Sequence, residues 1–370
     1  MTTTPTIPAP TPGLAVGQRT RELNPGWFAS VMGTGILAVT TYNNPGGLTG
    51  LASLAHAIGV GLAVATYLLA VILLVGNAVR WIAHTAAAAA DFRHPLKGAM
   101  HAALPGGLLV AAVMTSVVSP SLFSPLLATW IIAILVILGG SLALVMGIAF
   151  AVTLFTGQPP AESVNGGWFI PPVVTIIIPM GLAPLVSKAD ATTAGLLIVV
   201  SYAFYGMGFL LFLLTLGLVY DRLVLHPLPP APLAPTVWIG LGPIGVAALV
   251  PMTLAKAGTN LWADVAPAVN LLTRLASTAV WGFGLWWLSL AVVLLVRYVR
   301  KGGVPFHLGW WAFVFPLGAY TAATITLARS WQSPALEAVA AVLYLGLLAA
   351  WLVVGVRTLA GIRSGQIWKS

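Results

Sequence analysis

The chain has 370 residues, of which 59% are hydrophobic and only 6% are charged, and its mean hydropathy is +1.00. A soluble domain carries roughly a quarter charged residues, so this composition excludes a soluble fold. The chain has no cysteine, which excludes disulfides, thiol catalysis and metal sites with cysteine ligands. The net charge is +9. Its basic residues cluster at the ends of apolar segments and do not form a long polar face, so we do not expect nucleic acid as a partner.

The N-terminal segment, residues 1–23, is rich in Thr and Pro and lacks the apolar core of a signal peptide. We interpret it as a disordered cytoplasmic tail. Residues 24–360 are expected to form one transmembrane domain, and residues 361–370 a short cytoplasmic C-terminal tail.

Ten apolar windows, separated by polar or Pro/Gly breaks, have the length needed to cross a hydrocarbon core of about 30 Å. They lie at residues 25–42, 52–79, 101–119, 124–156, 168–186, 192–219, 235–255, 267–296, 308–328 and 335–356. The sequence therefore predicts an all-α integral membrane protein with ten transmembrane helices.

An even number of spans places both termini on the same side of the membrane. If that side is the cytoplasm, only Lys188, Lys256, Arg274 and Arg329 lie outside, which leaves 12 of the 16 Lys and Arg residues inside. Cytoplasmic loops are enriched in Lys and Arg. We therefore predict a multi-pass protein of the cell (plasma or inner) membrane with cytoplasmic N and C termini.

Odd and even spans differ in composition. The even spans are long and rich in Leu and Val, whereas the odd spans are shorter and contain Gly and Pro, which predicts breaks in their helices. Broken helices are tolerated where they are buried in protein or line a wet cavity. Trp27, Trp168, Trp238 and Trp311 stand near the starts of odd spans, at intervals that fit a repeat of about seventy residues. The pattern predicts five tandem helical hairpins whose odd helices line a central pore. The alternative is that Gly and Pro only allow close helix packing.

The apolar runs of the odd spans contain no Asp, Glu, Lys or Arg. A cation pathway is expected to carry intramembrane carboxylates, so the pattern favours small anions or neutral solutes. Three basic residues near the outer span ends, Lys256, Arg274 and Arg329, can concentrate anions at a pore mouth. Ordinary snorkelling to the membrane interface explains each of them equally well.

Hydroxyl groups and helix-breaking residues of the odd spans are the candidates for lining the pathway, because neutral donors can replace part of an anion's hydration shell. The candidate lining residues are Ser30, Gly33, Thr34, Gly35, Pro105, Gly106, Pro172, Thr175, Gly242, Pro243, Pro316 and Thr321. A helical Thr more often bonds its own backbone. Phe28 and Phe315 stand next to the predicted breaks, where each acts either as packing or as a hydrophobic plug.

Histidines raise the possibility of proton or redox chemistry. His56 and His101 fall within or near spans, but no matched His pairs occur as a two-haem bundle would need. No phosphate-binding, hydrolase or zinc-protease motif appears in a suitable context. We therefore expect no cofactor, no metal and no enzymatic activity. A membrane-bound redox enzyme is the contrasting hypothesis, and a bound chromophore would distinguish it.

Three motifs resemble one membrane family. Residues 24–35, NPGWFASVMGTG, residues 241–245, LGPIG, and residues 309–318, GWWAFVFPLG, together with His94-Pro95, are similar to the tellurite-resistance/dicarboxylate transporter family. That family includes the bacterial tellurite-resistance permease, fungal malate and sulfite transporters and plant slow anion channels. The resemblance extends from about residue 24 to residue 360. The residues of the LGPIG and FPLG segments are closest to those of the malate/sulfite branch.

The resemblance implies ten helices in five hairpins and a homotrimer in the lipid bilayer with one pore per subunit. It also implies a phenylalanine gate, placed on Phe315, with Phe28 as the first-helix aromatic. The family's first-helix proline is replaced near Val31, so the expected kink depends on Gly33 and Gly35. The implied function is transport of small anions such as malate, another C4-dicarboxylate, sulfite, halide or nitrate. A proton-coupled dicarboxylate or sulfite transporter is the alternative.

Overall fold

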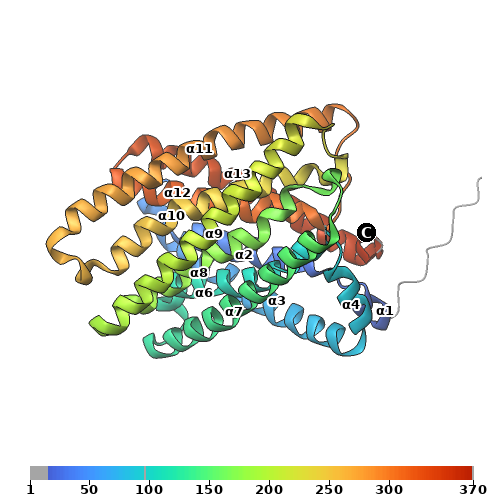
Figure 1. Ribbon diagram of the computed structural model, residues 1–370. Helices are drawn as coiled ribbons and strands as arrows, with labels where there is room; N and C mark the ends of the chain where they lie inside the picture. The colour runs from blue at the N-terminus through green and yellow to red at the C-terminus, as the bar shows by residue number, and fades with distance from the viewer. Residues whose placement is uncertain (1–15, 96, 369–370) are drawn as a thin grey trace, which may run out of the picture.

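Five short helices form the centre of the molecule, and five long helices surround them (Figure 1). The computed structural model describes residues 16–95 and 97–368, and no strand occurs in these ranges. The inner helices are α2 (Phe28–Tyr42), α6 (Ala103–Leu122), α8 (Ile170–Val186), α10 (Leu241–Ala257) and α12 (Val314–Trp331). The outer helices are α3 (Ala52–Ala83), α7 (Pro125–Gly157), α9 (Ala191–Leu225), α11 (Ala266–Arg300) and α13 (Pro334–Ser364).

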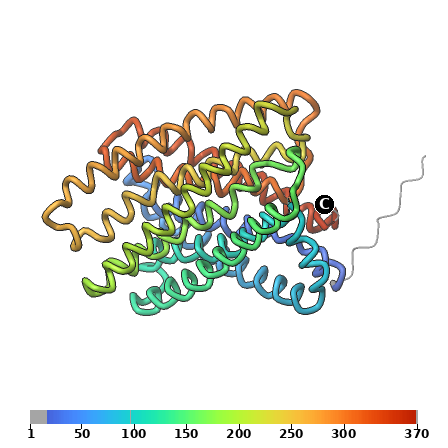
Figure 2. The backbone as a smooth tube through the Cα atoms, viewed as in Figure 1, coloured from blue at the N-terminus to red at the C-terminus, as the bar shows by residue number. Residues whose placement is uncertain are grey.

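The inner helices close a ring. In chain order each packs against the next, from α2 through α6, α8 and α10 to α12, and α12 packs against α2. Each outer helix packs against the inner helix before it and also against the next one around the ring. The chain path of five successive hairpins can be followed in Figure 2.

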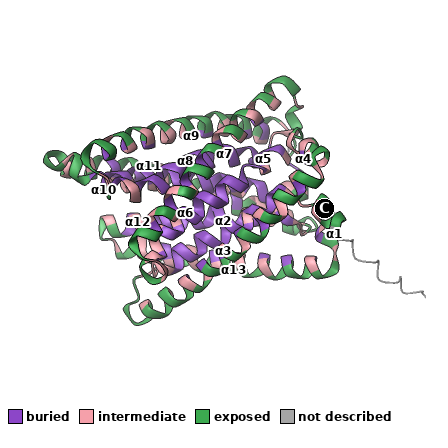
Figure 3. Ribbon diagram, turned by 90° about the horizontal axis from the view of Figure 1, so that it is seen from below, coloured by how far each residue is buried: buried purple, intermediate pink, exposed green. Residues whose placement is uncertain are grey.

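Burial separates the two sets of helices. In the spans that contain α6, α8, α10 and α12, between 78% and 83% of the most apolar window is buried, against 17% to 28% in the five outer spans. Figure 3 shows the buried residues gathered in the centre of the molecule and the exposed residues on the outer helices. Large apolar side chains that point outward suit lipid and not water. The predicted division into inner odd helices and outer even helices is confirmed.

Nine helical segments in the described ranges are long and apolar enough to cross a membrane. The 15-residue helix α2 is not among them, although it belongs to the inner ring. The fold is thus an all-α membrane protein, while the count of ten spans stays a prediction.

Four prolines of the inner helices lie at helix starts and not at breaks. Pro105, Pro172, Pro243 and Pro316 each occupy the third position of an inner helix. Proline is tolerated in the first turn because its missing N–H would have no partner inside the helix. The prediction of helices broken at these residues was therefore wrong. Stretches of 3-10 helix precede three of these helices, η4 (Gly166–Phe169), η5 (Ala231–Gly240) and η8 (Leu308–Phe313), and η1 (Pro25–Trp27) leads into α2.

Shorter helices complete the connections between the spans. They are α1 (Val16–Arg21), α4 (Thr85–Phe92), α5 (Lys97–Met100), η2 (Thr49–Leu51), η3 (Ala161–Ser163), η6 (Thr259–Leu261), η7 (Ala263–Val265) and η9 (Gln366–Trp368).

Both ends of the described chain lie at the end of the molecule where the inner helices begin (Figure 1). Helix α1, which falls in the segment expected to be a disordered tail, packs against α3. The first 15 residues of that expected tail lie outside the described ranges. At the C-terminus, Trp368 packs against Trp27 with ring centroids 5.6 Å apart.

Candidate functional site: a central cavity

A cavity of about 480 Å³ opens where the five inner helices begin. Every inner helix or the turn before it contributes to its wall. Representative lining residues are Met32, Ala103, Val173, Ile239 and Phe315. The cavity therefore lies on the axis of the inner ring, at the end of the molecule that contains α1 and the C-terminus.

The orientation of the inner helices gives this cavity an electrostatic character. The partial positive charge of a helix dipole lies at its N-terminus, where the first backbone N–H groups have no partner inside the helix. The five inner helices begin around the cavity, so the positive ends of their dipoles converge there. The first N–H groups of α2, α8, α10 and α12 donate to carbonyls of the 3-10 turns before them. Among its described lining residues, Lys97 is the only charged side chain, and no carboxylate is present. The cavity is thus suited to a small anion.

Phe315 forms part of the cavity wall where three inner helices meet. Its side chain is 6% exposed and lines the cavity. A Cβ built on Gly242 would lie 3.5 Å from Cε1 of Phe315 and 3.7 Å from Val173 Cγ2, so α8, α10 and α12 meet here. Within these contacts Phe315 is the bulkiest side chain, as a hydrophobic obstruction requires.

Beyond Phe315, one face of each of the four helices α6, α8, α10 and α12 continues the wall. An α-helix returns to nearly the same face after seven and eleven residues. Counted from Gly106, Val173, Gly242 and Phe315, these positions are Val113, Val117, Met180, Pro184, Leu249, Thr253, Ala322 and Thr326. All except Ala322 are partly exposed, while most of their neighbours on the same helices are buried. This pattern indicates that accessible space continues along the axis, with mainly apolar walls.

Most predicted hydroxyl groups do not face this path. Ser30 donates to the carbonyl of Trp27, Thr175 to that of Pro171 and Thr321 to that of Leu317. Thr34 accepts a hydrogen bond of 3.1 Å from Nε1 of Trp351 on an outer helix. The alternative that a helical Thr bonds its own backbone therefore describes Thr175 and Thr321, and Ser30 does the same.

The glycines of the inner helices serve two different purposes. A Cβ on Gly33 would meet Val314 and Trp311, and one on Gly35 would meet Val110, so both allow α2 to pack closely against its neighbours. Helix α2 is continuous across them. By contrast, a Cβ on Gly106 would lie 2.8 Å from Sδ of Met32, a lining residue, which places Gly106 near the axis.

Two of the predicted mouth residues have structural partners. Arg274 donates to the carbonyl of Ser330 at 3.0 Å and lies over the ring of Trp331. Arg329 pairs with Glu337 at 3.5 Å and donates to the carbonyl of Asn43. These arginines join helix ends on the side away from the cavity.

Lys256 and Phe28 complete the set of predicted site residues. Lys256 is exposed in the last turn of α10, where a cation interacts favourably with the helix dipole. Phe28 is 2% exposed and packs in the apolar core, and it does not line the cavity.

The 3-10 turns η1, η4 and η8, which lead into three inner helices, begin with side-chain caps of the same kind. Asn24 accepts from the N–H of Gly26, Asn165 from that of Gly167, and His307 from that of Gly309. Nδ1 of His307 is the acceptor, so Nε2 must carry the proton that it donates to the carbonyl of Pro232, 2.7 Å away. Burial lowers the pKa of His307, although the bond to Pro232 opposes this shift. His307 is therefore a neutral capping residue at the cavity wall.

His56 and His101, the two histidines considered as proton carriers, do not lie on the cavity wall. His56 stacks on Tyr42 with ring centroids 4.4 Å apart, and His101 Nδ1 bonds the carbonyl of Lys97. Neither residue lines the cavity. Within the described residues there is no cluster of His, Asp or Glu that could hold a metal ion.

The sequence pattern of the voltage-dependent anion channel family matches residues 22–359. The chain belongs to this family. The resemblance drawn from the three motifs is therefore confirmed, and so is the expectation of a membrane protein that transports anions and is not an enzyme.

Relatives in the family cover almost the whole chain. An uncharacterized transporter of Methanocaldococcus jannaschii is 31% identical over 350 residues, which are 93% of this chain and 95% of the relative. A sulfite efflux pump of Trichophyton rubrum is 25% identical over 351 residues, 90% of this chain and 89% of the pump. A malic acid transport protein of Schizosaccharomyces pombe is 20% identical over 365 residues, 92% of this chain and 79% of the relative.

Much of the cavity wall consists of residues that no sequence pattern indicated. Met32, Val173 and Ile170 are ordinary apolar residues, and only the geometry distinguishes them from their neighbours. Lys97 differs from these residues, since its charge and its place two residues after His94-Pro95, just before a span, can be seen in the sequence.

Proposed function

We propose that the chain moves small oxyanions, sulfite or a C4-dicarboxylate such as malate, passively along the axis of the inner ring, with Phe315 as the obstruction. The observation that carries this proposal is the cavity itself. Five helix N-termini and one lysine surround it without any carboxylate among its described lining residues, and the buried side chain of Phe315 forms part of its wall. The printed functions of the fungal relatives support the choice of solutes.

Passive movement is preferred to proton coupling on chemical grounds. A proton-driven transporter needs a group on the pathway that binds and releases protons. His307 lines the cavity, but both of its ring nitrogens are engaged with backbone groups. Proton-coupled transport of dicarboxylate or sulfite is the second candidate, and it would need a rearrangement of this cap.

The experiment is solute flux into liposomes that contain the purified protein. Sulfite, malate, chloride and nitrate are compared at equal ionic strength, with sucrose as a neutral solute and empty liposomes as the blank. We expect anion flux above the blank and no sucrose flux. Equal entry of sucrose, or no anion flux, would contradict the proposal.

We further propose the membrane orientation and assembly implied by the charge distribution and the resemblance. The cavity faces the cytoplasm together with both termini, in the cell membrane, and the chain forms a homotrimer with one pathway per subunit. Exposed apolar side chains on the outer helices, for example Leu68 and Leu214, suit either lipid or a second copy. Light scattering of the detergent-solubilised protein measures its oligomeric mass.

A further inference from the structure

Lys97 lies at the wall of the cavity, at the first residue of the short helix α5 that leads into α6. Its side chain is 44% exposed. As the only charged side chain among the described lining residues, it adds one positive charge to that of the five helix termini.

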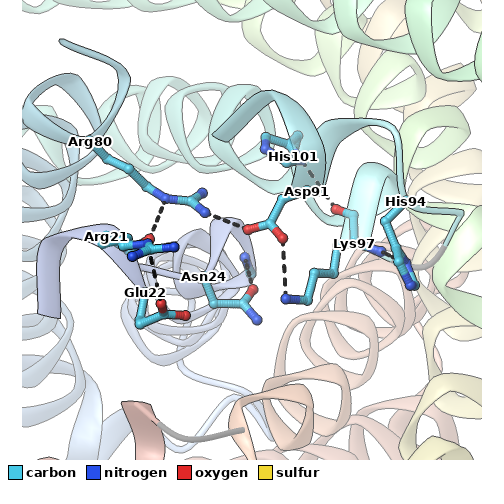
Figure 4. Close-up of polar contacts among 9 residues, drawn as sticks. Arg21, Glu22, Asn24, Arg80, Asp91, His94, Lys97 and His101 are labelled. Atoms are coloured by element: carbon cyan, nitrogen blue, oxygen red, sulfur yellow. Dashed lines mark hydrogen bonds and ion pairs between the residues drawn. The ribbon is translucent and has the colours of Figure 1, made fainter. Parts of the chain in front are cut away.

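The lysine is held by a carboxylate outside the cavity. Its Nζ lies 3.2 Å from Oδ1 of Asp91, on α4. The second oxygen of Asp91 accepts a hydrogen bond from the guanidinium of Arg80, on α3. Figure 4 shows the three side chains in line, with Asp91 between the two cations.

Arg80 is anchored more firmly than Lys97. Its side chain is 2% exposed, and its Nε donates to the carbonyl of Arg21 at 3.0 Å. Burial raises the pKa of Asp91, but the hydrogen bonds and charges of Arg80 and Lys97 outweigh it and hold the pKa below its usual range. A buried arginine needs its counter-ion, whereas a half-exposed ammonium can exchange partners at little cost. Asp91 is thus fixed on Arg80 and shared with Lys97.

The backbone of Lys97 is fixed as well. Its carbonyl bonds Nδ1 of His101, whose ring packs edge-on against Phe92 of α4 with centroids 5.1 Å apart. The mobile part of this residue is therefore its side chain, which can reach either Asp91 or an anion in the cavity.

We infer that Lys97 is the residue that recruits the anion at this mouth of the pathway, and that Asp91 is a positioning residue that competes with the anion for its ammonium group. This inference rests on the proposed function. The competition limits how tightly the anion is held, because an ion in transit must also leave.

The test uses the absence of cysteine in the chain. In Lys97→Cys the new thiol is the only one, so a positive aminoethyl or a negative sulfonatoethyl methanethiosulfonate reagent changes the charge at this site in one and the same folded protein. Flux is measured in liposomes against anion concentration. We expect the half-saturating concentration to rise about tenfold in Lys97→Cys, to recover with the positive reagent and to rise further with the negative one.

The matched control is Arg93→Cys, an exposed basic residue of the same connection that does not line the cavity. There, both reagents should leave flux unchanged. Equal responses of Lys97→Cys to the two reagents would overturn the inference, while anion flux in the unmodified protein would leave the proposed function standing. Absence of anion flux in the wild type would instead remove the proposed function.

A second variant tests the role of Asp91. Asp91→Asn releases the ammonium of Lys97 and should lower the half-saturating concentration, an effect that disappears when Lys97→Gln is combined with it. If Asp91→Asn does not fold because Arg80 loses its counter-ion, Asp91→Glu keeps the charge and alters only the distance to Lys97. Identical half-saturation in a folded Asp91 variant and the wild type would contradict the competition.

Discussion

Phe315 of α12 lies against Gly242 of α10, with 3.5 Å between Cε1 and the position that a Cβ on the glycine would take. This distance is an ordinary van der Waals contact, so the aromatic ring lies close to the backbone of α10. Phe315 also lines the cavity, and its side chain is therefore the one to change in a test of the proposed obstruction.

Removal of the Phe315 side chain should open the pathway. We expect Phe315→Ala to raise anion flux severalfold without loss of folded protein, because the removed atoms border a cavity. Phe28→Ala is the matched control. Phe28 packs in the core, where the loss of a buried Phe costs about 3–5 kcal/mol, so this variant should lose stability and gain no flux. A well-folded Phe315→Ala protein with wild-type flux would contradict the gate.

The contact between α10 and α12 should tolerate no methyl group at Gly245. A Cβ there would lie 2.6 Å from backbone atoms of Ala319 and Tyr320, which cannot rotate away. Overpacking of this kind costs about 1–3 kcal/mol, so Gly245→Ala should lower the thermal unfolding temperature. Gly282→Ala, with nothing within 4 Å, should be neutral or slightly stabilising. Equal unfolding temperatures for both variants would show that α10 and α12 pack less tightly than these distances indicate.

The architecture was predictable from the sequence because it depends on repeated features. Apolar length and the alternation of Leu-rich with Gly/Pro-containing segments predicted inner and outer helices, since each depends only on composition along the chain. The prolines were misread because the same residue suits a first helical turn and a break, and Pro243 or Pro316 alone does not distinguish them. The cavity walls could not be predicted from composition, because the side of a helix that faces the axis depends on its packing partners.

His307 should make stability depend on pH. Burial lowers its folded pKa, so between that value and the unfolded value of about 6.5 the unfolded chain binds more protons, and stability falls as pH falls. Protonation also removes the acceptor for the N–H of Gly309. His307→Asn introduces the capping residue that Asn24 and Asn165 already provide, and it has no group that titrates. In this variant the unfolding temperature should therefore fall less as the pH is lowered. His226 neither lines the cavity nor takes part in this cap, so the control His226→Asn should show the same fall in unfolding temperature as the wild type. An unchanged slope in His307→Asn would contradict this role.

Membrane orientation is testable with single cysteines. An impermeant maleimide applied to intact cells should label Thr259→Cys, at the end of α10 away from the cavity, and should not label Gln18→Cys or Ser364→Cys. All three residues are exposed in the structure, so only the membrane distinguishes them. Labelling of all three after permeabilisation is the control. The reverse pattern in intact cells would place the cavity outside.

Passive transport predicts a specific electrical behaviour. The pathway has no free carboxylate or histidine among its described lining residues, and the one histidine there is engaged on both ring nitrogens. Imposing a pH gradient at a fixed gradient of a strong-acid anion such as nitrate should therefore leave the reversal potential unchanged. Nitrate is chosen because sulfite and malate change their own protonation with pH. A shift that persists with nitrate and disappears in His56→Ala, His101→Ala or His307→Asn would establish proton coupling through that residue, and with it the alternative mechanism.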